Sequence, residues 1–399
     1  MSRLTEEQLD KIKNKYNVNK IWSFSRINKF KTSPYDYFLT YVKHIPSDRN
    51  DSIYVFTGNL GHEILDKLYE NKINYEDMIN EFEDGWIVFK EVSKLKFDRT
   101  DEIRDNSIAE KYKIDLQHFF THHTMYKNKL NIEKPVVINV NNNIFVGYMD
   151  AQYLDDDGIY HIVDFKTSSI YKGNTLIEHS AQLILYAIGF SQMYNIPLDK
   201  IKINFNFLKY CDIQYEQANG SIKTRQVERC KIGESLQTNL KVWIKKFGYE
   251  NKMDDMLKEV LDSNSIDSLP DEIKSKYVIS DCYVYVPITE KTVNDLIDDI
   301  TLTIKDIELR EKDYAETKSD ACFWDSEDNL KVQSYYLSNL CSYSPNLHKP
   351  YKAYLDKQEA IKNGQNMFDG IGSDVSISYG NKINSSNSEE LDLSWIDQL

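Results

Sequence analysis

The feature that most constrains the fold of this chain is a change of sequence character near residue 134. Residues 75–130 are rich in Lys, Glu and Asp at helical spacing, but the next segment, KPVVINVNNNIFVGYMDAQYLDDDGIYHIVDFKTSS, is rich in β-branched and aromatic residues. Turn signals at 141–143 and 155–158 interrupt that segment. We therefore predict three consecutive antiparallel strands, over 135–140, 144–154 and 159–166.

The segments that follow predict helices packed on a sheet. HSAQLILYAIGFSQMY predicts an apolar helix over about 178–194, and KIKINFNFLKY alternates as a strand does. Further along, the pattern predicts a hairpin around Asn219-Gly220 and a short strand over 280–288, with helices over 234–262 and 289–312. The predicted class is α/β, with a mixed sheet flanked by helices.

The domain organisation follows from the same patterns. We expect an N-terminal helix in 1–20 and one domain over 21–355, with mostly helical insertions at about 70–130 and 235–310. Residues 363–399 are rich in Gly, Ser and Asn and acidic, which predicts a disordered tail. Its apolar end and the segment 365–368, which resembles a sliding-clamp-binding peptide, suggest a protein partner in replication or recombination.

Composition and charge restrict the class of protein. The 399 residues include no apolar run of about 18 residues, and the N-terminus has no signal-peptide pattern, so we expect a cytoplasmic protein without a membrane segment. The five cysteines are widely spaced and form no CxxC, which argues against disulfides and a compact zinc site. The net charge of −14 counts against nucleic-acid binding, although a groove needs only local Lys and Arg.

The residues best suited to catalysis are Asp150, Asp164 and Lys166. Asp164 and Lys166 share one face of the third predicted strand, because side chains alternate along a strand. Asp150, on the neighbouring strand, could place its carboxylate beside that of Asp164. Paired carboxylates, with the carbonyl of Phe165 as a further oxygen ligand, suit Mg²⁺ or Mn²⁺. A D-x-K triplet alone is common, and an ordinary surface Asp–Lys pair would explain it.

Four further features accompany the triplet in a fixed order. The N-terminal segment SFSRINKFKTSPYDYF comes first, and Gly61-His62 then opens a predicted helix. Gly147 precedes Asp150 in a Gly-x-x-Asp pattern. Gln182 and Tyr186 follow at i and i+4 on the apolar helix, so they share one face.

This ordered set, over roughly residues 21–210, resembles the RecB-like branch of the PD-(D/E)xK nuclease superfamily. The resemblance implies a restriction-endonuclease-like sheet and a metal-dependent DNA nuclease, of exonuclease type, that acts in replication, recombination or repair. It makes Asp150 and Asp164 metal ligands and Lys166 catalytic. By the same resemblance, His62 binds metal. Gln182 and Tyr186 form a pair that supports the site and contacts DNA. Glu63 competes with His62 at the same helix start.

One feature of the cluster-bearing relatives is missing from this chain. Cluster-bearing relatives carry a cysteine where this chain has Ser33, and only Cys322 and Cys341 stand near the C-terminal positions, so we expect no iron–sulfur cluster. The composition fits a phage or bacterial protein, located in the host cytoplasm if it is phage-encoded. The alternatives are a catalytically silent module that binds nucleic acid or protein on the same fold, and an interaction protein with a chance D-x-K.

Overall fold

The computed structural model describes residues 3–50 and 52–369, with side chains through 363. Two compact units are present among these residues: the first contains residues 3–24 and 52–301, and the second contains 25–50 and 302–369. Most of the predicted acidic tail, residues 370–399, lies outside the described residues. No helix in the described part of the chain is long and apolar enough to cross a membrane.

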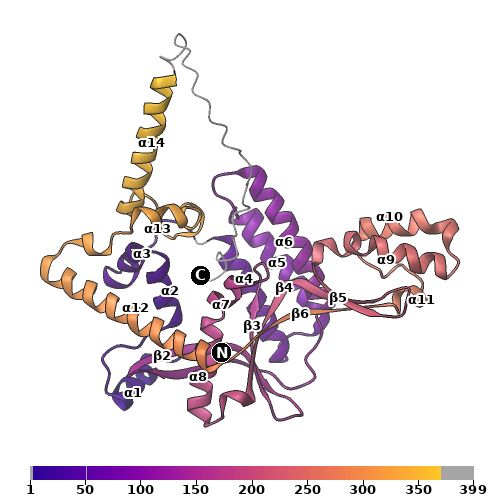
Figure 1. Ribbon diagram of the computed structural model, residues 1–399, viewed down its shortest axis with the longest axis horizontal. Coiled ribbons are helices and arrows are strands. Elements are labelled where there is room, and N and C mark those ends of the chain that lie inside the picture. The colour runs from indigo at the N-terminus through magenta and orange to yellow at the C-terminus, as the bar shows by residue number, and fades with distance from the viewer. Residues whose placement is uncertain (1–2, 51, 370–399) are drawn as a thin grey trace. The chain divides into compact units, whose positions relative to one another are not determined.

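A six-stranded mixed sheet forms the centre of the first unit (Figure 1). Its strands run in the order β1-β2-β3-β4-β5, and β6 pairs with the other edge of β4. The bounds are Asn131–Val140, Asn143–Leu154, Tyr160–Lys166, Ile201–Glu216, Ile222–Glu228 and Tyr277–Val286 for β1 to β6. The first three strands are antiparallel neighbours, which confirms the predicted meander.

One parallel connection interrupts the antiparallel pattern and places the apolar helix. β3 and β4 run parallel, and helices α7 (Asn174–His179) and α8 (Ala181–Tyr194) join them. Parallel neighbours need such a crossover, because the chain must return to the same end of the sheet before the second strand begins. Eight of the residues of α8 are buried, from Leu183 to Phe190, so the apolar run packs against the sheet as predicted.

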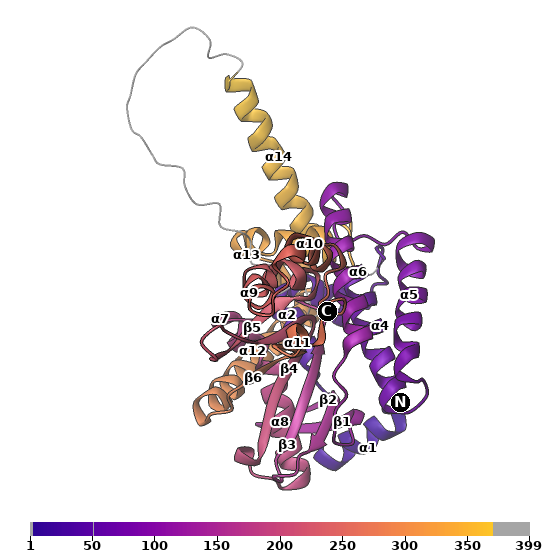
Figure 2. The same cartoon turned by 90° about the vertical axis from the view of Figure 1, so that its right-hand side faces the viewer.

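Three long helices of the first unit lie side by side (Figure 2): α4 (Ile53–Tyr69), α5 (Met78–Ile87) and α6 (Glu102–His122). Short turns surround α5, namely η2 (Tyr75–Asp77) and η3 (Val88–Val92). Near the N-terminus, helix α1 (Glu6–Tyr16) begins with a capping box, in which Thr5 and Gln8 satisfy each other's backbone N–H groups.

A second apolar core surrounds the outer halves of β4, β5 and β6. Helices α9 (Ile232–Lys246), α10 (Met253–Ser263) and α11 (Asp271–Lys274) gather there (Figure 1). Trp243 is buried in this core and its indole N–H donates to the carbonyl of Glu216. The short turns are η4 (Leu198–Lys200), η5 (Arg229–Lys231) and η6 (Glu250–Lys252). Because β6 pairs along β4, the region 235–310 supplies part of the central sheet as well as helices.

The second unit is helical. Its N-terminal segment contains α2 (Phe24–Thr32), α3 (Pro34–Tyr37) and η1 (Phe38–Val42). Ser33 caps α3 through the N–H of Asp36, and Pro34 occupies its first turn, where its missing N–H costs nothing. The remaining helices are α12 (Glu290–Thr317), whose residues up to Thr301 belong to the first unit, η7 (Asp320–Phe323), α13 (Glu327–Val332), η8 (Tyr336–Leu340) and α14 (Lys349–Asp369).

Candidate active site

Asp150, Asp164 and Lys166 lie at one end of the β2–β3 pair. The register pairs Ala151 with Val163, and one step further along it sets Asp150 opposite Asp164. Side chains directly opposite each other in an antiparallel pair point to the same face. The Asp150 carboxylate also accepts a hydrogen bond of 3.0 Å from the backbone N–H of Phe165, which ties the two strands together at the site.

His62 reaches this cluster from helix α4. Its Nε2 lies 2.9 Å from the carbonyl oxygen of Phe165, and its Nδ1 lies 3.6 Å from Oδ2 of Asp150. The histidine therefore sits between the carboxylate and the backbone carbonyl that the sequence suggested as metal ligands.

Glu133 is a member of the site that the sequence reasoning missed. It lies on β1, and the register that pairs Ile132 with Ala151 and Lys134 with Met149 sets it opposite Asp150. Ligand atoms of His62, Glu133 and Asp150 all lie within 4.8 Å of one another. The turn at 141–142 sets the register of the two strands, and this register makes Glu133 the partner of Asp150. The strand predicted from the sequence, 135–140, starts too late to include Glu133.

The backbone of Glu133 is strained. Its φ is +50°, a left-handed conformation that non-glycine residues rarely adopt inside a strand. Such residues cost roughly 1–3 kcal/mol and concentrate at functional sites. This positive φ is the conformation in which β1 presents Glu133 opposite Asp150.

Burial and like charges shape the electrostatics of the cluster. Burial raises the pKa of Asp150 to about 7; the charge of His62 opposes this shift and that of Asp164 adds to it. Burial and the neighbouring Glu133 likewise raise the pKa of Asp66, one turn after His62, to about 6. The anionic forms are disfavoured there, so a bound cation would stabilise them.

Asp164 pairs with Lys166. Its Oδ2 lies 2.8 Å from the ammonium nitrogen, and both side chains are largely buried. Burial lowers the pKa of Lys166, but the acidic groups around it, Asp164 first and Asp150 with it, together outweigh burial and the net shift is upward, so the lysine is charged at neutral pH. Asp164 is not among the three residues whose ligand atoms gather within 4.8 Å. The structure thus brings His62, Glu133 and Asp150 together and leaves Asp164 next to them, paired with the lysine.

Gln182 and Tyr186 share one face of α8, as their spacing predicted. The Gln182 amide donates a 2.8 Å hydrogen bond to the Tyr186 hydroxyl. Burial raises the pKa of Tyr186 to about 12, and the charges of Asp150 and Asp164 add to this shift. The tyrosine ring lies against β2 at Gly147, three residues before Asp150. By contrast, Glu63 points to solvent and pairs with Lys67 at 2.9 Å, so the structure does not bring it into the cluster.

Gly147 explains the Gly-x-x-Asp pattern. A Cβ at this position would overlap Cε1 of Tyr186, so only glycine lets the tyrosine ring lie against β2.

We expect Gly147→Ala to lower the free energy of unfolding by about 1–3 kcal/mol through overpacking, measured by chemical denaturation. Gly58→Ala is the matched control, since its nearest neighbour would lie at an ordinary 3.8 Å. In the double variant Gly147→Ala/Tyr186→Ala the clash is gone, so its loss of stability should be smaller than the sum of the two single losses. A loss equal to that sum or larger would contradict the steric explanation.

Comparison with known proteins identifies the family of this chain. The model of the PD-(D/E)XK nuclease superfamily matches residues 21–271, more than half of the chain. A search of curated proteins found no match to this chain. The six-stranded mixed sheet flanked by helices is consistent with the restriction-endonuclease-like fold, and nucleases of this superfamily use divalent metal ions. From the extent of this match, together with the fold, we conclude that the chain belongs to the PD-(D/E)XK nuclease superfamily.

Proposed function

We propose that this protein is a metal-dependent DNA nuclease of the RecB-like branch, acting as an exonuclease on DNA ends or single strands. One observation carries the proposal: His62, Glu133 and Asp150 gather their ligand atoms within 4.8 Å, beside the buried Asp164–Lys166 pair. An ordinary strand surface has no reason to combine this set, because buried carboxylates without a cation destabilise the fold.

The donor set fits Mg²⁺ or Mn²⁺. Asp150 and Glu133 offer carboxylate oxygens, the carbonyl of Phe165 offers another, and His62 offers an imidazole nitrogen. In our proposal Asp164 is a further ligand. When bound, a divalent cation supplies Lewis acidity, which lowers the pKa of water and stabilises charge on a phosphate.

The side chains of the chain itself would divide the remaining work. Lys166, held beside Asp164 and charged, orients the attacking water and stabilises negative charge on the phosphate. Gln182 holds the hydroxyl of Tyr186 beside the cluster, and we propose that this pair supports the site and contacts DNA.

The biological setting belongs to the same proposal. A DNA nuclease of this type would act in replication, recombination or repair, and the acidic tail would bind a partner protein. We also keep the prediction that no iron–sulfur cluster is bound. The rival function is a silent binding module on the same fold, and the net charge of −14 favours it, because such a protein binds DNA phosphates poorly outside a local groove.

The test is a digestion assay. End-labelled single- and double-stranded DNA is incubated with Mg²⁺ or Mn²⁺ and wild-type protein or Asp164→Ala. We expect the wild type to shorten the DNA and the variant to leave it intact. Asp356→Ala is the control, because it breaks an exposed ion pair with Lys352. Equal degradation by both variants would indicate a contaminating nuclease, and DNA binding without cleavage by the wild type would favour the silent module.

Glu133→Gln tests the acid that the structure adds to the site. The amide keeps the size of the side chain but removes a charged oxygen ligand, so we expect the Mn²⁺ concentration for half-maximal cleavage to rise about tenfold or more. Glu63→Gln is the matched control, since Glu63 is 63% exposed and pairs with Lys67. An equal effect of the two substitutions would remove Glu133 from the proposed metal site.

A further inference from the structure

A second group of potential ligands lies elsewhere in the first unit. Asp115 on α6, Glu228 at the end of β5 and Cys230 in η5 place their ligand atoms within 4.8 Å of one another. None of these residues belongs to the set around Asp150. The nuclease reaction proposed above does not use them.

Asp115 carries a buried oxygen without a partner. The residue is fully buried, and its Oδ1 accepts a 2.6 Å hydrogen bond from the backbone N–H of Cys230. Its Oδ2 has no hydrogen-bond partner among the residues that the structure describes. A buried carboxylate oxygen in this state costs the free energy of its lost hydration unless a proton or a cation compensates it.

The buried Lys209 forms no ion pair with Asp115 in the described part of the chain. Lys209 is buried, and its ammonium nitrogen lies 3.7 Å from the ring centroid of Tyr112. Glu228 pairs with Lys231 at 2.6 Å, on the partly exposed side of the group. Among the described residues, no side chain donates a hydrogen bond to the free Oδ2 of Asp115, and the carboxylate of Glu228 and the sulfur of Cys230 lie near the Asp115 carboxylate.

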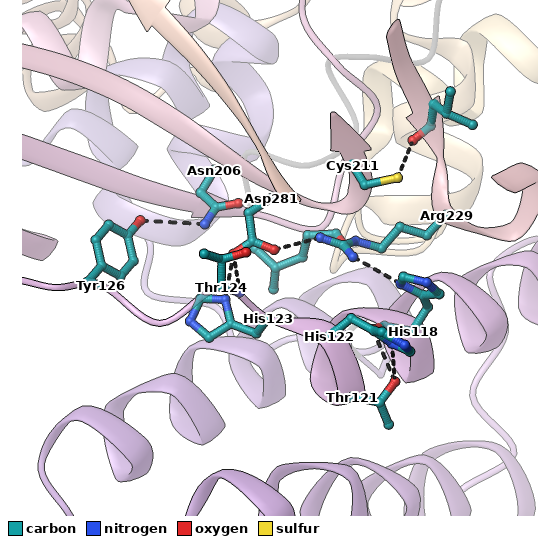
Figure 3. Close-up of polar contacts among 12 residues, drawn as sticks. His118, Thr121, His122, His123, Thr124, Tyr126, Asn206, Cys211, Arg229 and Asp281 are labelled. Carbon is teal, nitrogen blue, oxygen red and sulfur yellow. Dashed lines mark hydrogen bonds and ion pairs between the residues drawn. The ribbon is translucent and has the colours of Figure 1, made fainter. Parts of the chain in front are cut away.

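Arg229 stands between Glu228 and Cys230 in the chain. Its guanidinium belongs to a buried polar network with Asp281 and His118 (Figure 3). The Arg229 side chain donates to the carbonyl of Leu208 at 2.9 Å and to Asp281 at 2.7 Å. Its own carbonyl accepts a 2.6 Å hydrogen bond from the amide of Asn264. These contacts fix the backbone of η5 at Arg229, the residue that joins Glu228 to Cys230.

We propose that Asp115, Glu228 and Cys230 bind one divalent cation of the zinc type, which links helix α6 to the end of β5. The ligand chemistry selects the ion: a thiolate with two carboxylates suits Zn²⁺ or Co²⁺, whereas Mg²⁺ prefers oxygen alone. On binding, Cys230 releases its thiol proton to solvent and its sulfur coordinates the metal. A water molecule completes the four-coordinate set.

The test uses Co²⁺ as a spectroscopic probe of the full-length protein after chelator treatment. Only a site with a thiolate ligand gives a thiolate-to-cobalt charge-transfer band. We expect one equivalent of Co²⁺ to produce the band in the wild type, and Zn²⁺ to displace it. The band should disappear in Cys230→Ser and weaken at least tenfold in Asp115→Asn at the same Co²⁺ concentration. It should persist in Asp150→Ala, which separates this site from the nuclease site.

Cys322→Ser is the matched cysteine control, because Cys322 is also a partly buried free thiol. Thermal melting in the Asp150→Ala background provides a second readout: Zn²⁺ should raise the Tm of Asp150→Ala but not that of Asp150→Ala/Cys230→Ser. If a variant does not fold, Glu228→Gln, at the partly exposed ligand, replaces it in both measurements. A wild type without the band, or a band that Cys230→Ser retains, would overturn the proposal.

Discussion

Lys166→Met should lower kcat for DNA cleavage by roughly 10²–10³-fold, the range seen when one preorganised group that stabilises transition-state charge is removed. Methionine keeps the length and most of the volume of the side chain but removes its charge. The lysine ammonium lies 2.8 Å from Asp164, and only 15% of its side chain is exposed, so water cannot replace the lost charge. Steady-state kinetics at saturating Mn²⁺ measures the effect.

Two comparisons isolate this effect from general damage. Lys172→Met, at an exposed position a few residues further along, should retain wild-type activity. Lys166→Arg keeps the charge but changes its geometry, so it should recover only part of the rate. A Lys166→Met enzyme within tenfold of the wild type, with an unchanged Tm, would contradict the role proposed for this lysine.

Arg229→Met should lower the free energy of unfolding by about 3–5 kcal/mol, because it leaves the carboxylate of Asp281 buried without its cation. Side-chain exposure is 1% for Arg229 and 0% for Asp281. Burial acts to raise the pKa of Asp281, but its hydrogen bond with His123 and the charge of Arg229 keep it below the usual value. Burial and Arg229 also lower the pKa of His118 to about 3, so this histidine is neutral and its Nδ1 can accept from the guanidinium (Figure 3).

Chemical denaturation in the presence of a chelator measures this loss without a metal contribution. Arg225→Met removes an exposed arginine nearby and should change stability by less than about 1 kcal/mol. The double variant Arg229→Met/Asp281→Leu removes both charges and should be more stable than Arg229→Met alone. If the double variant is the less stable of the two, the destabilisation does not come from the unpaired carboxylate.

Local patterns carried much of the fold prediction. Alternation and turn residues located the meander, and the apolar run located α8, because strands and helices of this kind are specified by nearby residues. The order of motifs selected His62, Asp150, Asp164 and Lys166, which lie close together in the structure. Their chemical roles remain predictions.

Long-range pairing explains what the sequence did not reveal. β6 pairs along β4 although many helical residues separate them, and no local pattern specifies such a partner. The network of Arg229, Asp281 and His123 depends on this pairing, so it could not be predicted. Glu133 was missed for a different reason, since strand ends are less certain than strand centres.

The second unit has a consequence for the synthesis of the chain. Residues 25–50 belong to a unit whose other segment begins at residue 302. At the usual rate of translation, the early segment waits on the order of 10–50 s for that partner. Its aromatic side chains, among them Tyr35, Tyr37 and Phe38, are buried in the finished protein and are exposed during this interval. Ribosome-associated chaperones are therefore expected to bind the nascent chain at this segment until residues beyond 302 are synthesised.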